Sequence, residues 1–249
     1  DFKFSSLASI DNDLLSIGLK LSFERLMSMG QLFGPANIDV DIRKLDAKTL
    51  VQMQDKLQQL NHAQSLPKEK VTELTAQVDK LLVTLVSHGA EWSVKNFTLK
   101  MPQGLMKGEL DVKVPAGIKI ENAMALKEHV VAKGQLTVPA VLVDEKMVKQ
   151  ASRKIYYQQR ILKMQQGQQQ ISKQASTANN VQPVVEPVKT LSRDEIKALA
   201  KDKAEAQIKK LIDNQILIKD KADYVFKFTF DKGHLSINDK PFSPDMLDQ

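Results

Sequence analysis

Hydrophobic and polar residues alternate along several stretches of the chain, which is the pattern of β-strands with one apolar and one solvated face. In residues 15–23, Leu, Ile and Phe occupy every second position, and Ser, Gly and Lys lie between them. Residues 36–42 repeat the pattern with Asn and Asp as the polar partners. The other stretches that we predict as strands are residues 92–101, 105–114 and 130–138.

The end of the chain predicts a β-hairpin. Residues 224–230 read YVFKFTF, residues 234–237 read HLSI, and a short segment that ends in Gly233 separates these two alternating runs. Glycine adopts positive φ at little cost, so Gly233 suits the bulged turn of a hairpin. We therefore expect the chain to end with two antiparallel strands.

In the remaining segments apolar residues recur every three or four positions, which predicts helices. The predicted helices begin near Asp46, Pro67, Val141 and Ser192. Ser192 also begins a capping box with Glu195. Because strands with one apolar face need cover, we predict a single α+β domain over residues 1–249, in which a long twisted antiparallel β-sheet has helices packed on one face.

Residues 165–190 differ in composition from the rest of the chain. Five of the six residues from 165 to 170 are Gln, and Ser, Thr, Asn and Pro follow them. Such a composition offers little apolar surface to offset the entropy lost on ordering. We therefore interpret residues 165–190 as a flexible insertion or linker.

The formal net charge is +6, and the basic excess is concentrated in one segment. Residues 146–173 contain seven basic residues, and no acidic residue follows until Glu186. A basic amphipathic helix with tyrosines at its middle is suited to an anionic membrane surface, although a helix whose stripe packs on a sheet and whose charges are solvated is the simpler interpretation. The candidate anion- or membrane-binding residues are Lys146, Lys149, Arg153, Lys154, Arg160 and Lys163.

The sequence lacks the usual motifs of catalytic, cofactor and metal sites. It contains no Cys, no nucleophile motif, and no glycine-rich phosphate loop. The four histidines are too widely spaced to form a paired ligand set. Asp39 and Asp41 share one strand face and suit a cation or an acid–base pair, but a solvated strand face is the simpler interpretation. We therefore predict no catalytic, cofactor-binding or metal-binding residues.

Three stretches resemble the YdgA-like family of bacterial envelope proteins, a family of unknown function. They are residues 32–50 (LFGPANIDVDIRKLDAKTL), the strand segments 89–112 and 132–143, and the terminal hairpin 224–242. The family pattern closes this hairpin with Asn-Gly-Lys-Pro, whereas Asp239 replaces the glycine here. These turn and strand signatures concern the fold, and no catalytic residue can be transferred from them.

The resemblance implies a periplasmic protein whose full-length form is anchored in the inner membrane by an N-terminal segment, so that this chain is its C-terminal part. In that context the Gln-rich stretch is an insertion. We expect a non-enzymatic binding or structural module whose partner is an anionic lipid or another envelope protein, and a homo-oligomer is a further alternative. The alternative is an enzyme, namely a hydrolase whose site is assembled only in the tertiary structure. Nucleic acid binding is not expected, because few aromatic residues are available to stack on bases.

Overall fold

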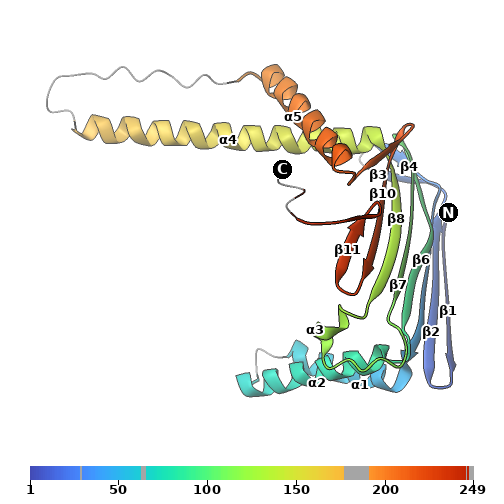
Figure 1. Ribbon diagram of the computed structural model, residues 1–249. Helices are drawn as coiled ribbons and strands as arrows, with labels where there is room; N and C mark the ends of the chain where they lie inside the picture. Colours follow the sequence, from blue (N-terminus) through green and yellow to red (C-terminus); the bar gives the residue numbers. More distant parts are fainter. Residues whose placement is uncertain (29, 63–65, 177–190, 245, 247–249) are drawn as a thin grey trace. The chain divides into compact units, whose positions relative to one another are not determined.

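A computed structural model describes residues 1–28, 30–62, 66–176, 191–244 and 246, and the side chains of all of these except residues 166–176. The chain divides into two compact units. Unit 1 comprises residues 1–139 and 214–249, and unit 2 comprises residues 140–213 (Figure 1). The single domain expected from the sequence stays a prediction, because this division describes contacts and not cooperative folding.

Within the described residues of unit 1, ten strands form one antiparallel sheet. Its order is β1-β2-β5-β6-β7-β8-β10-β11-β12, and β9 also pairs with β10. Strands β3 (Leu26–Ser28) and β4 (Gln31–Phe33) form a separate hairpin. The strands of the sheet are β1 (Phe2–Asp11), β2 (Leu14–Phe23), β5 (Ala36–Asp46), β6 (Glu91–Met101), β7 (Gly104–Lys113), β8 (Val131–Pro139), β9 (Ile218–Asp220), β10 (Asp223–Asp231), β11 (His234–Ile237) and β12 (Lys240–Pro241). The predicted α+β class with a long antiparallel sheet and helices packed alongside is confirmed.

The register places the apolar residues of successive strands on one face of this sheet. Residues directly opposite each other in a ladder project to the same face, so a chain of paired residues traces a row across the sheet. One such row is Leu19, Val40, Val94, Leu110, Gly134, Phe228 and Ile237. A second row is Ile17, Ile42, Trp92, Val112, Ala132, Phe230 and Leu235.

Two strand glycines on this apolar face lie beneath aromatic rings. A Cβ built on Gly134 would come within 2.6 Å of Cε1 of Phe228, the residue directly opposite. A Cβ on Gly108 would come within 3.0 Å of Cδ1 of Phe97. Each of these glycines leaves space for an aromatic ring that covers the backbone.

Two residues with positive φ form bulges that preserve the alternation of faces. Lys44 (φ 60°) is the extra residue of β5 opposite β2, and Asn96 (φ 54°) is the extra residue of β6 opposite both of its neighbours. Without the bulge at Asn96, Val94 and Phe97 would point to opposite faces, because they are three residues apart. The bulge therefore keeps both side chains on the apolar face.

Asn238 joins two short strands on the outer side of β10. Strand β9 pairs with the beginning of β10 and β11 pairs with its end, so Lys227 lies between the two ladders. There Oδ1 of Asn238 accepts a hydrogen bond from the backbone N–H of Lys227 (3.0 Å), and the backbone N–H of Asn238 donates to the carbonyl oxygen of Lys227 (2.9 Å). The side-chain amide nitrogen of Asn238 donates to the carbonyl oxygens of Gln215 (2.7 Å) and Ile216 (3.0 Å).

The predicted terminal hairpin is confirmed, with a tighter turn than expected. Asp231 pairs directly with His234, so only Lys232 and Gly233 form the loop. Both have positive φ (49° and 79°), which is the type I′ turn that suits the twist of antiparallel strands. The turn between β11 and β12 has the same character, since Asn238 and Asp239 also have positive φ.

In unit 1 helices α1 (Ala47–Asn61) and α2 (Lys68–Val86) lie side by side near the ends of the strands, where both contact β5 (Figure 1). Helix α1 begins where the sequence predicts, because the Oδ1 atom of Asp46 accepts a hydrogen bond from the backbone N–H of Thr49 (2.7 Å). Helix α2 buries Leu74 and Leu85. The short helix α3 (Ala123–Leu126) contacts α2.

Unit 2 contains helices α4 (Ala140–Ser176) and α5 (Arg193–Asp213). Ala151 and Ile155 of α4 pack against Ile196 and Ala200 of α5, and Ala200 is completely buried. The capping box predicted at Ser192 is present, with the Ser192 N–H donating to Glu195 and the Glu195 N–H donating to the Ser192 hydroxyl.

Part of the segment predicted as a flexible insertion or linker, residues 165–190, belongs to a helix. Helix α4 continues to Ser176, so residues 165–176 are helical, and the flexibility of the segment stays a prediction. Gln has a high helix propensity, and a helix that is already nucleated extends through such residues at little cost. Residues 177–190 lie outside the described residues.

Candidate functional site

The apolar face of the sheet is a feature of unit 1 that could receive a ligand. Its side chains on β2, β5, β6 and β7 are mostly half-buried. The side chain of Trp92, at the centre of one apolar row, is 47% exposed, and that of Leu136 is 36% exposed. Towards β1 the exposure increases, to 59% for Phe4 and 65% for Ile10. A contiguous exposed apolar surface of this kind marks a binding site more often than a solvated face.

This face offers very few hydrogen-bonding groups. In the two rows described above, Trp92 carries the one side-chain polar atom, an indole N–H. Tyr224, which pairs with Val138, adds a hydroxyl, although Tyr224 itself is buried. A ligand on this face is therefore held mainly by apolar contact.

The opposite face of the sheet carries the charges, and they form local ion pairs. Asp41 accepts from Lys95 (3.2 Å) and from Arg43 (3.3 Å), and Asp39 accepts from the side chain of Asn96 (2.9 Å). Asp39 and Asp41 thus behave as the solvated strand face predicted from the sequence. Among the described residues, no group of His, Asp or Glu is arranged to hold a metal ion.

Glu91 on the same face is bound to Lys44, the residue of the bulge. The Lys44 ammonium lies 2.8 Å from the Glu91 carboxylate, and this hydrogen bond lowers the pKa of Glu91 from its usual value. Because Lys44 has positive φ, the bulge directs its side chain towards the neighbouring strand. The contact is a structural ion pair on an exposed face.

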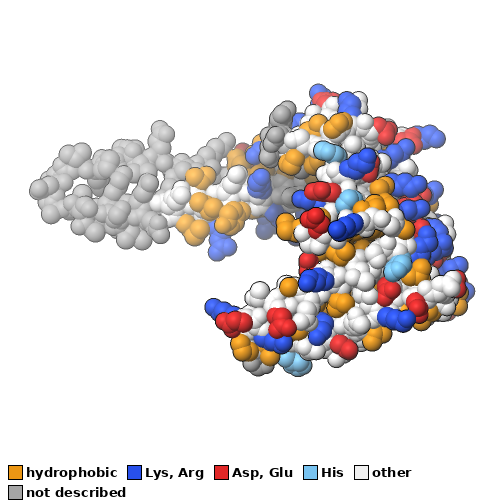
Figure 2. All heavy atoms as spheres, turned by 60° about the horizontal axis from the view of Figure 1, so that its bottom comes forward, with side chains coloured by type: hydrophobic (Ala, Val, Ile, Leu, Met, Phe, Trp, Pro, Cys, Tyr) orange, Lys and Arg blue, Asp and Glu red, His pale blue; other side chains and the backbone are white. Residues whose placement is uncertain are grey.

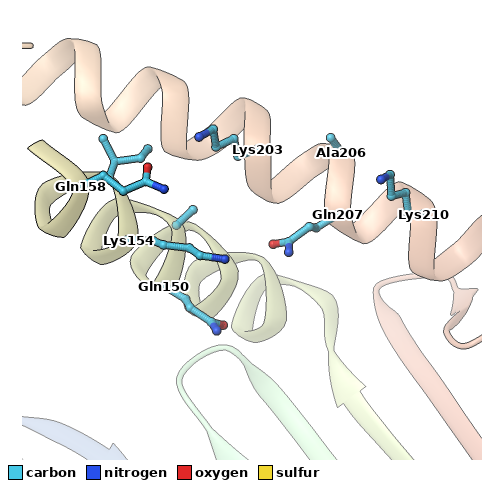
Figure 3. Close-up of a pocket in the computed structure, with 9 residues that line it drawn as sticks. Gln150, Lys154, Gln158, Lys203, Ala206, Gln207 and Lys210 are labelled. Carbon is cyan, nitrogen blue, oxygen red and sulfur yellow. The ribbon is translucent and has the colours of Figure 1, made fainter. Parts of the chain in front are cut away.

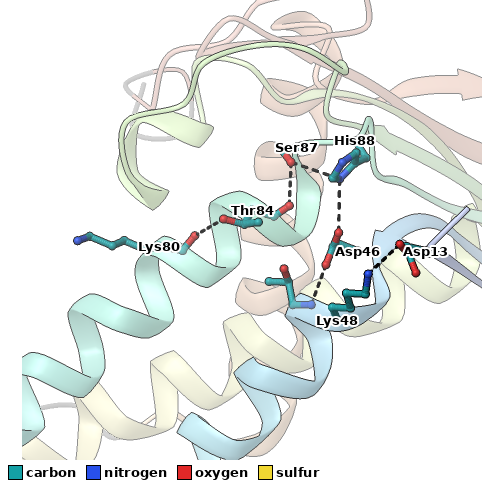
Figure 4. Close-up of polar contacts among 8 residues, drawn as sticks. Asp13, Asp46, Lys48, Lys80, Thr84, Ser87 and His88 are labelled. Atoms are coloured by element: carbon teal, nitrogen blue, oxygen red, sulfur yellow. Dashed lines mark hydrogen bonds and ion pairs between the residues drawn. The ribbon is translucent and has the colours of Figure 1, made fainter.

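Ser87, His88 and Asp46 form a cluster whose composition matches that of a hydrolytic triad (Figure 4). The Ser87 hydroxyl lies 3.4 Å from Nδ1 of His88, and the Asp46 carboxylate lies 3.9 Å from the same nitrogen. A triad needs the carboxylate at one ring nitrogen and the nucleophile at the other. The Ser87 hydroxyl also donates to the carbonyl oxygen of Thr84 (2.8 Å), as serines near helix ends commonly do. This geometry does not support nucleophilic catalysis.

Asp46 is instead a helix cap. Its carboxylate accepts from the backbone N–H of Thr49, and this bond is the main reason why the pKa of Asp46 is lowered, with a smaller contribution from His88. Nearby, Lys48 donates to the carboxylate of Asp13 over 2.9 Å (Figure 4). These contacts fasten the start of α1 to the sheet.

The six basic residues singled out in the sequence lie on α4, and all six are exposed. Five of them follow one another at intervals that place them along a single side of the helix, away from the buried Ala151 and Ile155. Tyr156 and Tyr157, at the middle of this side, are 47% and 67% exposed. We call this side the basic face of α4, and its residues are Lys146, Lys149, Arg153, Arg160 and Lys163.

Lys154 is separated from the other five. It lines a cavity of about 300 Å³ between α4 and α5, together with residues that the sequence analysis did not single out (Figure 3). The sequence shows the spacing of these residues within each helix. It does not show which side of α4 faces which side of α5. The side chains around the cavity belong to Gln150, Ala151, Lys154, Ile155, Gln158, Lys203, Ala206, Gln207 and Lys210.

Charge is distributed unequally between the two units. Of the 36 basic and 30 acidic residues, 14 and 8 lie in unit 2, which leaves 22 of each kind in unit 1. In Figure 2 blue and red side chains are interspersed over the surface turned to the viewer, with hydrophobic side chains between them. The whole formal charge of +6 therefore belongs to the helical unit 2.

Comparison with known proteins identifies the family. A family model described as a bacterial protein of unknown function (DUF945) matches residues 1–245. The chain belongs to the DUF945 family. The expectation of a bacterial family of unknown function is thereby confirmed, and the narrower YdgA-like relationship stays a prediction. No curated protein and no solved structure matches the chain, so no substrate or partner follows from a DUF945 relative.

Among the described helices of this DUF945 protein, none combines the length and apolar character required to cross a membrane.

Proposed function

We propose that this protein is a non-enzymatic component of the bacterial envelope that holds lipid acyl chains against the apolar face of its sheet. The two apolar rows that cross seven strands carry the proposal. With strands about 4.8 Å apart, each row is roughly 30 Å long, which exceeds the roughly 15 Å that one leaflet contributes to the hydrocarbon core of a bilayer. The face thus has the length and the chemistry that an extended acyl chain requires.

Acyl chains suit this face better than a protein partner does. A protein interface contains about one hydrogen bond per 100–200 Å² of buried area, and the two rows offer a single side-chain donor in Trp92. A polymethylene chain needs no such partner, and it gains about 0.8 kcal/mol for each CH₂ removed from water. The half-buried side chains of β2 to β7 are accessible to it.

The basic face of α4 is a second, independent observation that supports the same proposal. It brings five cationic side chains and the exposed Tyr156 and Tyr157 to one side of a helix. This combination is suited to the headgroup region of an anionic membrane, where each Lys or Arg near the surface contributes about 1 kcal/mol. In the proposed function this face contacts the membrane that supplies or receives the lipid.

A periplasmic location, the narrower YdgA-like relationship and the role of this chain as the C-terminal part of an anchored protein belong to the same proposal. Their support is the resemblance of the turn and strand signatures, including the terminal hairpin. Cell fractionation of a bacterium that carries the protein tests the location. The hydrolase alternative is not proposed, because the Ser87–His88–Asp46 cluster lacks the geometry of a triad.

The experiment is native mass spectrometry of the purified chain, followed by organic extraction and lipid analysis. The matched variants are Leu110→Gln, on the apolar face, and Glu109→Gln, the neighbouring residue on the polar face. We expect a co-purifying lipid of defined stoichiometry in the wild-type chain and in Glu109→Gln, and its loss in Leu110→Gln with an unchanged circular dichroism spectrum. A lipid-free wild-type chain, or equal lipid content in both variants, contradicts the proposal. A discrete dimer without lipid indicates a homo-oligomeric role for the face instead.

A further inference from the structure

The cavity between α4 and α5 has walls made of two matched polar stripes. Gln150, Lys154 and Gln158 recur every four residues along α4, so they share one side of that helix. Lys203, Gln207 and Lys210 share one side of α5 in the same way. Figure 3 shows Lys154 and Gln207 directed towards each other across the gap. A Gln-Lys-Gln stripe therefore faces a Lys-Gln-Lys stripe.

The cavity has an apolar floor that is fixed by packing. It is formed by Ala151 and Ile155, and Ile155 is 3% exposed within the α4–α5 core. Because the floor belongs to the contact that holds the two helices together, the positions of the walls are set by packing. The volume of about 300 Å³ lies at the lower limit of ligand pockets, which indicates a small ligand or one small group of a larger ligand.

No carboxylate lines this cavity, although α5 carries several acidic residues. Two of them are engaged elsewhere, since Glu205 pairs with Lys201 (3.7 Å) and Asp213 pairs with Lys209 (3.4 Å). Within the described part of the chain, neither Lys154 nor Lys203 takes part in an ion pair. At Lys154 and Lys203 the lining thus offers positive charge with amide donors beside it, and no carboxylate belongs to the cavity wall.

From this arrangement we propose that the α4–α5 cavity binds a phosphoryl group, as a free phosphate or as the phosphodiester of a headgroup. Lys ammonium groups and Gln side-chain amides donate hydrogen bonds, and the oxygens of a phosphoryl group accept several at once. An anion between Lys154 and Lys203 also removes the repulsion between the cations of the two helices. Monoesters and inorganic phosphate share this chemistry with a lipid headgroup.

This site is distinct from the apolar sheet face and from the basic face of α4. Its residues lie entirely within unit 2, and Lys154 is the one candidate from the sequence that contributes to it. The inference therefore does not rest on the binding of acyl chains. Loss of lipid binding by Leu110→Gln and loss of phosphate binding by cavity variants are independent results.

The experiment is isothermal titration calorimetry of the full 249-residue chain in a phosphate-free buffer, with two soluble probes. Inorganic phosphate represents the free anion, and glycerophosphoglycerol represents a deacylated anionic headgroup. Preference for inorganic phosphate assigns the cavity to a free anion, and preference for glycerophosphoglycerol assigns it to a headgroup. Both outcomes support the phosphoryl site.

The test variant is Lys154→Gln with Lys203→Gln, and its control is Lys197→Gln with Lys201→Gln. Each pair removes two positive charges from unit 2, but Lys197 and Lys201 do not line the cavity and do not belong to the basic face of α4. We expect the preferred probe to bind at least about tenfold more weakly to the test variant and within about twofold of wild type to the control. Equal weakening in both variants, or no saturable binding of either probe to the wild-type chain, overturns the proposal. Circular dichroism establishes that both variants remain helical.

Discussion

Phe228 lies over Gly134 on the neighbouring strand, so closely that a Cβ on the glycine would be 2.6 Å from the ring and 3.0 Å from the carbonyl oxygen of Glu109. The φ angle of Gly134 does not require glycine, because it is not in the positive region. The glycine is therefore needed for space. It allows the ring to cover the backbone within an apolar row.

We predict that Gly134→Ala lowers the free energy of unfolding by about 1–3 kcal/mol, because the ring must leave its position or the strands must separate. Gly18→Ala is the control, since it lies in a strand on the polar face and its Cβ would have only ordinary contacts, beginning at 3.4 Å. Urea denaturation measures both. A Gly134→Ala protein as stable as Gly18→Ala would mean that Phe228 moves freely.

Asn238→Asp is predicted to lower the free energy of unfolding by about 2–4 kcal/mol. Asn238 is buried, and its amide nitrogen donates to two carbonyl oxygens that a carboxylate would repel. The comparison is Asp239→Gly, the next residue of the same turn, which is exposed and has a φ of 66°. Glycine suits that conformation, so we expect a gain of about 0.5–1 kcal/mol. The measurement is thermal unfolding. A melting temperature that is unchanged in Asn238→Asp would show that β9 and β11 remain paired with β10 without these hydrogen bonds.

Acidification is predicted to remove a stabilising contribution of Asp46. The pKa of this carboxyl is lower in the folded chain than its ordinary value of 3.8, chiefly because it accepts from Thr49 N–H. A group whose pKa is depressed on folding contributes stability above its unfolded pKa and loses it as the pH falls through its folded pKa. The contribution is therefore present at pH 5 and lost as the pH falls below about 3.8.

The measurement for Asp46 is the free energy of unfolding against pH for the wild type, Asp46→Asn and Asp46→Ala. Asn retains the capping acceptor but cannot titrate, so the difference between wild type and Asp46→Asn should shrink on acidification. Ala removes the cap and should cost about 1 kcal/mol near neutral pH. A difference between wild type and Asp46→Asn that is constant with pH would show that the cap does not depend on charge.

Ala200→Leu is predicted to disrupt the α4–α5 contact, with a loss of about 1–3 kcal/mol. Ala200 is completely buried against α4, so a larger side chain has no space. Ala198→Leu, on an exposed position of the same helix, is the control and should change stability by less than about 0.5 kcal/mol. Protease susceptibility of unit 2 measures the effect, and equal susceptibility of the two variants would indicate that α5 can shift to accommodate the leucine.

The sequence predicted the central strands well because their alternation is nearly perfect. It did not predict β1, where Ser5 and Ser6 interrupt the alternation and the edge position removes the demand for an apolar partner on one side. The sequence also did not indicate the bulge at Asn96. Asn adopts positive φ more readily than most residues, but its presence in a sequence does not predict that conformation. Pairing with both neighbours decides that conformation.

In helix α4 the sequence composition indicated a linker where the chain is helical. The composition of residues 165–176 resembles that of flexible linkers, but composition measures the apolar surface available for burial and not the local preference of a chain that enters from an existing helix. The candidate site was predicted in part. The basic face of α4 follows from the spacing of its residues, whereas the cavity requires two helices to meet, and only Lys154 was singled out from it.

The division of charge between the units separates long-range attraction from apolar contact. Unit 1 is neutral overall and unit 2 carries the whole excess of six positive charges. The electrostatic attraction of a polyanion therefore acts mainly on unit 2. Raising the ionic strength should slow association with a negatively charged partner without altering the apolar face of the sheet.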